Sequence, residues 1–341
     1  MSPHAAQRMA RESATQPFDS AAKAINLDWG TNYDGKQMQR IGEALGRTLV
    51  GKREAERRAC ERGERPRGPA NDPALLVIEM DGGRVQSREK NAETGSRWRE
   101  DKVLAISSYV PGAAGVSGEK EQREPEKVLT TYLATMADAD AFGRLARVEA
   151  ERRGIRQARQ AIQIGDGASW IDTQHQQQFF RCPRIVDYYH AAEHLHESAR
   201  AACGAEESAA QALADQMKGD LYEGRIEQVI ATLRTQAQRL GPPREADPPQ
   251  HPRRVLARDV GYFQKHAAHM DYPAYRAQGW PIGSGVIESG VKLMGKRVKG
   301  SEQFWNESGA EAILALRALW LSEDARWDNY WLCGHYRQKA A

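Results

Sequence analysis

The sequence predicts an α/β fold, in which helices flank a mixed five-stranded sheet and an all-helical insertion interrupts the domain. Short, nearly continuous apolar runs alternate with helical patterns in the order three strands, helix, strand, helix, strand, helix. A later stretch, 198–280, is rich in Ala, Glu, Gln and Arg and has helical periodicity throughout. With 341 residues, 40% of them hydrophobic, the chain is large enough to bury a substantial core.

The N-terminal region, residues 1–70, is polar and mostly helical in pattern, with a break at 28–32. We expect one amphipathic helix over 34–58, because its apolar residues recur at helical spacing. Charge, Gly and Pro together make 62–69 a linker that does not pack.

Three strands follow as a meander. The first, 75–81, is apolar almost throughout, as expected of a central strand that is buried on both faces. We place the second at 102–110 and the third at 127–136. The loop between these two strands, 111–125, is Gly-rich and charged and is therefore expected to be exposed.

Alternating helices and strands continue the sheet. The expected elements are a helix that begins at the N-cap Asp138 and ends near Arg153 before Gly154, a strand at 161–165, a helix at 169–180, a strand at 184–187 and a long helix from His190. A meander followed by βαβ units suggests an RNase H-like sheet, in which the first and fourth strands are parallel neighbours.

The last part of the chain is helical. The insertion 198–280 contains a helix that ends at Gly241-Pro242-Pro243, and a further helical stretch over 288–321 is broken near 299–301. We therefore divide the chain into four segments. Residues 1–70 are a helical N-terminal region that is a candidate for DNA-end recognition. Residues 71–197 and 281–341 are the two parts of a catalytic domain, and 198–280 are the helical insertion between those parts.

Three carboxylates stand where a nuclease needs them. Asp81 and Asp166 each follow an apolar strand and precede Gly, and Glu288 lies on a helix after a Gly-rich turn. In the predicted sheet the two aspartates end side by side. Such carboxylates can share two Mg²⁺ ions, with Mn²⁺ as a substitute, for chemistry on a phosphodiester. The alternative for a single Asp-Gly pair is a simple turn.

A second cluster lies around Asp187 and His190. His190 and His194 are four residues apart on one helical face, with Glu197 beyond, so a zinc site is one interpretation. A structural alternative is that Asp187 and His190 orient the active-site edge through hydrogen bonds. A third interpretation is that His190 contacts the scissile phosphate.

The helix after Glu288 is basic. We expect DNA contacts from Lys292, Lys296, Arg297 and Lys299, and from the aromatic Trp305, although Trp305 could instead pack the helix onto the core. The net charge of the whole chain is only +3, so a nucleic-acid surface must be local.

The four cysteines are scattered without a CxxC pair, which argues against a disulfide framework and fits a reducing compartment. The sequence has no long apolar run and no apolar signal core. We expect a cytoplasmic protein that does not enter membranes and, in a bacterial cell, associates with the nucleoid.

Several of these segments occur together in one known family. In order they are MDGGRVQ from Met80, WREDKV from Trp98, GDGASWI from Gly165, IVDYYHA from Ile185, PIGSGVIE from Pro281 and RVKGSEQFW from Arg297. The chain resembles the DDE-type transposases of bacterial insertion sequences of the ISKra type, which are distantly related to Mutator-like transposases. The resemblance covers about residues 70–331.

The resemblance implies an RNase H-like catalytic domain with a helical insertion. Asp81, Asp166 and Glu288 correspond to the catalytic triad, and Asp187 and His190 to the D-x-x-H pattern of Mutator-like relatives. It further implies cleavage at terminal inverted repeats, strand transfer into target DNA and homo-oligomers on DNA. The family is often longer at the N-terminus, where some members carry a Cys-containing zinc segment that this sequence lacks.

Three alternatives remain open. The first is an RNase H-like nuclease that cuts structured DNA without joining ends. The second is a transposase-derived DNA-binding protein that has lost catalysis, and the third is a zinc-dependent hydrolase built on His190 and His194.

Overall fold

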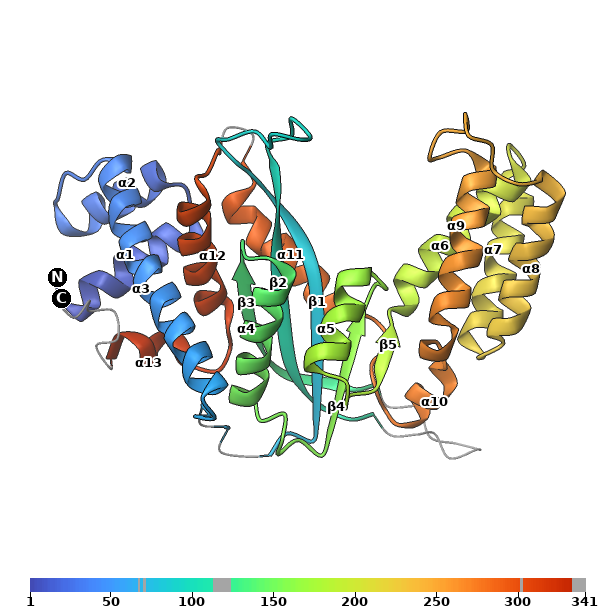
Figure 1. Ribbon diagram of the computed structural model, residues 1–341. Helices are drawn as coiled ribbons and strands as arrows, with labels where there is room; N and C mark the ends of the chain where they lie inside the picture. Colours follow the sequence, from blue (N-terminus) through green and yellow to red (C-terminus); the bar gives the residue numbers. More distant parts are fainter. Residues whose placement is uncertain (67, 70–71, 113–123, 301–302, 333–341) are drawn as a thin grey trace.

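A five-stranded mixed sheet forms the centre of the protein (Figure 1). The computed structural model describes residues 1–66, 68–69, 72–112, 124–300 and 303–332, so the expectation for the loop 111–125 lies largely outside the described residues. The strands are β1 Leu75–Gln86, β2 Trp98–Val110, β3 Glu126–Thr135, β4 Gln160–Gly165 and β5 Arg184–Val186.

The strand order is β3-β2-β1-β4-β5. β1, β2 and β3 are antiparallel neighbours, whereas β4 pairs with both β1 and β5 in parallel. The predicted RNase H-like sheet, with its first and fourth strands as parallel neighbours, is therefore confirmed.

β1 is longer than predicted. It continues through Asp81, Gly82 and Gly83 because these residues stay paired with β2 as far as Gln86. On its other side, pairing with β4 ends at Glu79 opposite Ile164. The expectation that the strand stops at Asp81 was thus wrong, but β1 does lose its β4 neighbour two residues before Asp81.

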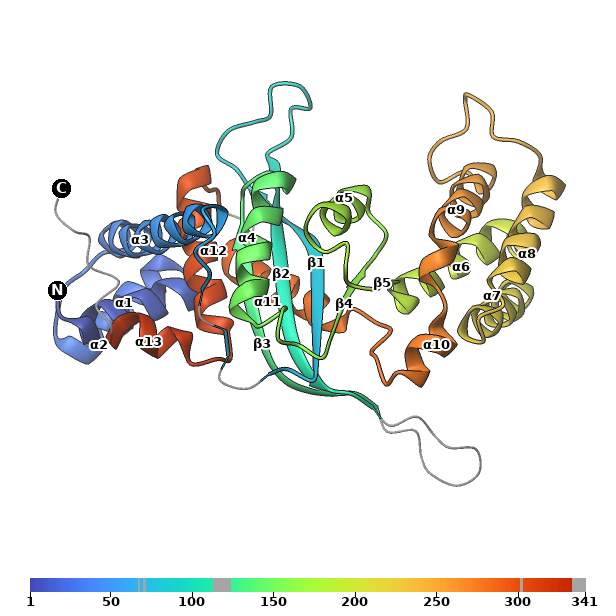
Figure 2. The ribbon, with the colours of Figure 1, turned by 60° about the horizontal axis from the view of Figure 1, so that its bottom comes forward.

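Alternate residues of β1 pack on opposite faces of the sheet. Leu76, Ile78 and Met80 pack with α4 Ala139–Arg152 and α5 Ser169–Gln178 on one face. On the opposite face, Val85 packs against α11 Gly285–Val298 and α12 Glu307–Leu321, and Leu75 and Val77 pack against the helices of the insertion. Figures 1 and 2 show α4 and α5 on one side of the sheet and α11 on the other. Burial on both faces explains the continuous apolar run.

The N-terminal region forms three helices: α1 Pro3–Thr15, α2 Phe18–Trp29 and α3 Gly35–Glu61. The break at 28–32 is confirmed, since α2 ends at Gly30 with φ +63°. Asp34 caps α3 by accepting from Gln37 N, and the Gln37 side chain accepts from Asp34 N in return. α1 and α3 pack against α12, with Ala6, Ala10 and Leu45 joining the core beside β3.

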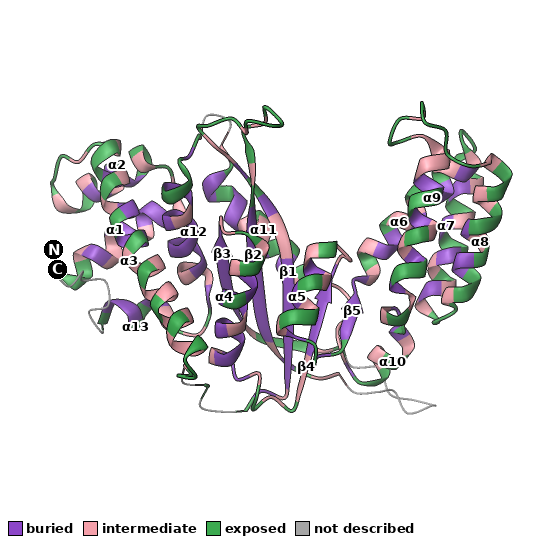
Figure 3. Cartoon of the chain, in the orientation of Figure 1, coloured by how far each residue is buried: buried purple, intermediate pink, exposed green. Residues whose placement is uncertain are grey.

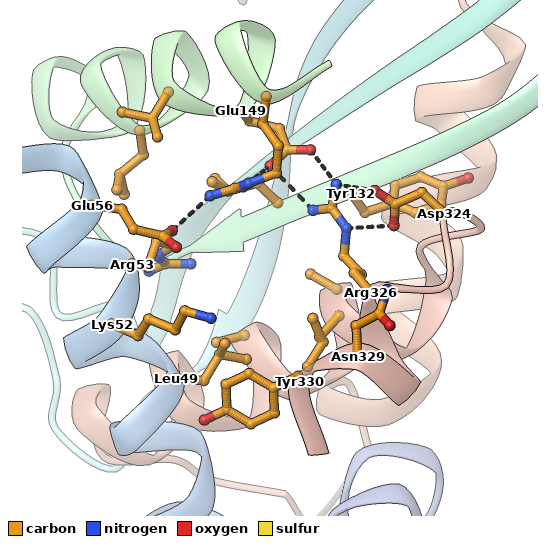
Figure 4. A pocket seen from close by; sticks show the side chains of 17 residues that line it. Leu49, Lys52, Arg53, Glu56, Tyr132, Glu149, Asp324, Arg326, Asn329 and Tyr330 are labelled. Carbon is orange, nitrogen blue, oxygen red and sulfur yellow. Dashed lines mark hydrogen bonds and ion pairs between the residues drawn. The ribbon is translucent and has the colours of Figure 1, made fainter. Parts of the chain in front are cut away.

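A cavity of about 310 Å³ lies between α3, α4, β3 and the last helices, α12 and α13 Arg326–Leu332 (Figure 4). Five of its charged side chains form ion pairs with one another: Glu56, Glu149, Arg152, Asp324 and Arg326. Glu149, only 1% exposed, accepts from Arg152 and Arg326, and Arg152 also binds Glu56 on α3. These ion pairs connect the N-terminal helices to the sheet domain.

The remaining helices form an arm beyond the β5 edge (Figure 1). They are α6 Tyr188–Cys203, α7 Glu207–Tyr222, α8 Ile226–Leu240, α9 Pro252–His266, the short 3₁₀ helix η1 Ala267–His269 and α10 Tyr272–Ala277. Their buried faces point inward and their exposed faces outward (Figure 3). The expected insertion boundary at 197/198 falls within α6. Among the described residues, no helix is long and apolar enough to cross a membrane.

Candidate active site

Three acidic side chains lie in the region where β1 and β4 separate, close enough that the charges of Asp166 and Glu288 act on Asp81. The last β1–β4 pair joins Glu79 to Ile164, and Asp81 and Asp166 each lie two residues further along their strands. Parallel register therefore brings these two aspartates to the same end of the two strands, which we call the acidic edge of the sheet. Glu288 reaches this edge from the first turn of α11, which packs on β1.

The electrostatics of Asp81 show that the carboxylates interact. The pKa of Asp81 is raised to about 6, mainly by burial; the hydrogen bond from Gly82 N opposes this rise, and the charges of Asp166 and Glu288 contribute to it. The nearby His190 lowers the pKa of Asp81. The repulsion among these acids is of the kind that a bound cation relieves.

The insertion holds Asp166 in place. The Asp166 carboxylate accepts a hydrogen bond from Ala168 N at 2.8 Å, and its backbone carbonyl accepts one from the Tyr262 hydroxyl of α9 at 3.0 Å. Gly167 has φ +92°, and a Cβ there would lie 2.9 Å from the Tyr262 ring. Glycine is thus needed both for the turn and for the close approach of α9.

Asp187 ties the helix of Glu288 to the sheet. Its buried carboxylate accepts from Tyr189 N at 2.7 Å at the start of α6, and from both the backbone N–H (3.1 Å) and the hydroxyl of Ser284. Ser284 is the N-cap residue of α11. Tyr188 N also donates to Ile282 O at 2.9 Å. The first turn of α11, with Glu288, is therefore clamped to the end of β5.

His190 and His194 have different surroundings. His190 is partly exposed, and its Nδ1 lies 3.6 Å from the Glu193 carboxylate. The Nδ1 of His194 is 2.8 Å from the buried Asp259, and its ring stacks on Tyr262. His194 therefore already bonds within the insertion, which does not favour a zinc site made with His190.

The basic residues of α11 divide into two groups. Lys292, Lys296 and Lys299 are exposed, and Lys292 lies 3.6 Å from the Glu288 carboxylate. Arg297 is 1% exposed and Trp305 5% exposed. The expectation that Arg297 and Trp305 present an open surface to DNA was wrong, because both pack against the N-terminal helices.

The packing of Arg297 and Trp305 is specific. Arg297 Nε donates to Ser13 O of α1 at 2.7 Å, and its guanidinium lies 4.6 Å from the Phe18 ring and 5.2 Å from the Trp305 ring. Trp305 Nε1 donates to Val298 O at 3.0 Å. The alternative interpretation of Trp305 as a core residue is therefore confirmed.

Two further acids on this face of the sheet were not singled out from the sequence. Glu79 is 1% exposed, and burial together with the charges of Asp187 and Glu288 raises its pKa well above the usual value. Asp101, opposite Gly83 on β2, is also buried, and burial raises its pKa to about 6. The signal was visible in the sequence, since Glu79 is the one charged residue within an apolar run.

The donor chemistry of the acidic edge suits Mg²⁺, which prefers carboxylate oxygens and keeps several water ligands. Within the described part of the chain, no group of three or more His, Cys, Asp or Glu side chains is arranged so that it could hold a metal ion as it stands. The fit of Asp81, Asp166 and Glu288 to a metal thus rests on their oxygen donors and their mutual repulsion.

Comparison with known proteins gave a distant structural likeness. No protein-family model matches the chain, and no curated protein matches its sequence. Among solved structures, a chain of the Drosophila P element transposase strand transfer complex matches with a TM-score of 0.34 and 8% sequence identity. The match covers 89% of this chain and 96% of that chain.

Proposed function

We propose that this protein is a DDE-type transposase of the ISKra type, which cleaves DNA at the ends of an insertion sequence and transfers the freed strand into target DNA. The observation that supports the proposal is that the charges of Asp166 and Glu288 act on Asp81 where β1 and β4 separate, in an RNase H-like sheet. The family motifs found in the sequence support the same function.

Each acidic residue has a role set by its element. The charges of both Asp166 and Glu288 act on Asp81. Asp81 would therefore bind both metal ions, while Asp166 and Glu288 would each bind one. Bound divalent ions would activate a water or a 3′-hydroxyl and stabilise the leaving oxygen. Asp187 and Tyr262 act as positioning residues, since one fixes the helix of Glu288 and the other the backbone of Asp166.

The exposed lysines of α11 are suited to the phosphates of bound DNA. Lys292 and Lys296 follow Glu288 on α11, Lys299 is the residue just after this helix, and all three are open to solvent. Phosphate neutralisation by such residues contributes affinity without sequence preference. We propose that the protein acts on the terminal inverted repeats as a homo-oligomer, as expected for joining two ends.

The decisive experiment compares the wild type with Asp81→Asn on DNA that carries the element's terminal repeats. Mg²⁺-dependent nicking should be lost in the variant while DNA affinity stays within about twofold. Asp215→Asn, which makes the same change at an exposed aspartate of α7, is the matched control and should cleave normally. Nicking retained by Asp81→Asn would refute the assignment.

A second assay separates transposition from simple cleavage. Pre-cleaved ends with a free 3′-hydroxyl should become joined to a target plasmid only if the protein is a transposase. Cleavage without joining would identify a structure-specific nuclease. Binding without either activity in the wild type would identify a DNA-binding protein that has lost catalysis.

A further inference from the structure

A pocket of about 280 Å³ lies where the N-terminal helices meet the segment that follows α11. Its wall includes Phe18 and Asp19 at the start of α2, Lys36 on α3, Arg88 after β1 and Arg297 near the end of α11. None of these residues belongs to the proposed acidic site. The volume is at the lower end of the range of roughly 300–1,000 Å³ that is usual for small-molecule sites.

Arg297 is a buried cation without a full set of partners. Its Nε bonds to Ser13 O, but neither Nη1 nor Nη2 has a hydrogen-bond partner among the residues that the structure describes. The Phe18 and Trp305 rings flank the guanidinium and offset part of the cost of burying it. Burial and the charge of Arg317 lower the pKa of Arg297 to about 10, so the group is still charged at neutral pH.

The described lining of the pocket carries excess positive charge. Among the residues that the structure describes, three cations line it, namely Lys36, Arg88 and Arg297, against one carboxylate, that of Asp19. Lys36 and Arg88 are exposed and able to reach a ligand, whereas Arg297 adds a fixed charge from the wall. An anion would therefore be attracted, and the low-dielectric wall strengthens that attraction.

Two other groups indicate that the ligand of this pocket is more than a bare anion. Phe304 lines the pocket and is 41% exposed; the Arg97 guanidinium lies 5.6 Å from its ring, and the exposed part of the ring could stack against a base. The side-chain oxygen of Gln303, which also lines the pocket, has no hydrogen-bond partner within the described part of the chain. A nucleotide offers a phosphate for the cations, an aromatic base for Phe304 and N–H or O–H donors for Gln303.

We propose that this pocket binds one nucleotide, with its phosphate against Lys36 and Arg88 and its base against Phe304. Arg297 is nine residues after Glu288 on the same helix, which at 1.5 Å rise per residue is about 14 Å along the axis. A DNA strand that passes the acidic edge could reach the pocket within a few nucleotides. This role in strand binding rests on the proposed function, whereas nucleotide binding itself does not.

Binding is measured on the full chain in EDTA, so that catalysis plays no part. The probes are a short 5′-phosphorylated oligothymidylate, the same oligomer with uncharged methylphosphonate linkages and no 5′-phosphate, and thymidine monophosphate, each titrated by calorimetry. The wild type should bind the phosphorylated oligomer at least tenfold more tightly than the uncharged one. Thymidine monophosphate that binds as tightly as the oligomer would identify a free nucleotide as the ligand rather than a strand.

Substitutions locate the binding site. Lys36→Ala and Arg88→Ala should each weaken binding of the phosphorylated oligomer about tenfold, and Phe304→Ala should weaken it severalfold. Lys23→Ala removes an exposed lysine of α2 that does not line the pocket, and should leave affinity unchanged. Arg297→Lys should bind less tightly if it folds, and the two surface variants decide the question if it does not.

The proposal is overturned if the wild type does not distinguish the two oligomers, or if Lys36→Ala and Arg88→Ala both bind within twofold of the wild type. The test is independent of the acidic residues. An Asp81→Asn variant that neither cleaves DNA nor loses nucleotide binding would support both proposals, whereas loss of binding in the pocket variants alone would support only this one.

Discussion

The substitution Asp187→Asn tests how the helix of Glu288 is held. The Asp187 carboxylate is 1% exposed and accepts from Tyr189 N at 2.7 Å, from Ser284 N at 3.1 Å and from the Ser284 hydroxyl. A longer contact joins it to His190 N at 3.4 Å. Asparagine has nearly the same shape but is neutral, and one of its two polar atoms is a donor that faces other donors.

The size of the effect follows from these contacts. A hydrogen bond to a charged group contributes about 1.5–3 kcal/mol, and one between neutral groups about 0.5–1.5 kcal/mol. Each of the three shorter bonds should therefore lose about 1 kcal/mol when the charge is removed. We expect the free energy of unfolding to fall by about 3 kcal/mol, as measured by denaturant titration.

Cleavage should fall further than stability alone would require. Ser284 begins the helix whose first turn carries Glu288, so a weaker clamp misplaces that carboxylate. At a temperature where the variant is fully folded, we expect Mg²⁺-dependent cleavage to fall at least a hundredfold. Asp138→Asn is the control, because Asp138 caps α4 through one bond to Ala141 N and asparagine caps equally well.

The reasoning is refuted if Asp187→Asn cleaves DNA within a few-fold of the wild type, or if Asp138→Asn loses as much activity. A loss of stability without loss of cleavage would mean that Asp187 supports the fold only. In that case Glu288 would have to be positioned by other contacts of α11.

Two further predictions concern the fold around the site. Gly167→Ala and Gly241→Ala both place Ala at a positive φ, which costs roughly 1–2 kcal/mol, but a Cβ at 167 lies 2.9 Å from Tyr262 while nothing lies within 4 Å of one at 241. Unfolding assays should therefore show loss of stability in both variants. Cleavage assays should show loss of activity only in Gly167→Ala. Equal activity of the two variants would mean that the close approach of Tyr262 to Gly167 does not matter for cleavage. Arg326 and Arg152 lower the pKa of the buried Glu149 from 4.5 to about 2. The charge of Glu149 therefore contributes about 3 kcal/mol to the free energy of unfolding above pH 4.5. This contribution is lost as the pH falls toward 2. Glu149→Gln should be less stable than the wild type by several kcal/mol at pH 7, with the gap closing in acid denaturation below pH 4.5; a constant gap would rule out the titration of Glu149 as the cause.

The order and type of the strands were predictable from the sequence because burial on both faces leaves a continuous apolar run. The runs from Leu75 and Ala161 gave two central strands, and their parallel pairing followed from the RNase H-like arrangement that the order of the elements suggested. Asp138 and Gly154 marked the ends of α4 correctly, because capping and positive-φ positions have strong local preferences. These features depend on residues close together in sequence.

The missed features depend on residues far apart. Nothing near Gly82 and Gly83 indicated that β1 continues, because the pairing partner is β2. The basic neighbours of Arg297 suggested an exposed DNA contact, but Arg297 is buried by contacts with Ser13 of α1 and Phe18 of α2, which lie far earlier in the chain. Two of the hydrogen bonds to Asp187 come from Ser284, which lies almost a hundred residues further on. These contacts join residues that are far apart in sequence, and helical or strand periodicity cannot predict such contacts.

The core on the α11 side of the sheet has a consequence for biosynthesis. Val85, Val103 and Tyr132 emerge early from the ribosome, but they are covered by Met294 and Leu316, which are made much later. At about 5–20 residues per second, this apolar face stays open for on the order of ten seconds or more. We expect the nascent chain to depend on chaperones during this interval, and premature termination within the insertion to yield an aggregating fragment rather than a partly folded domain.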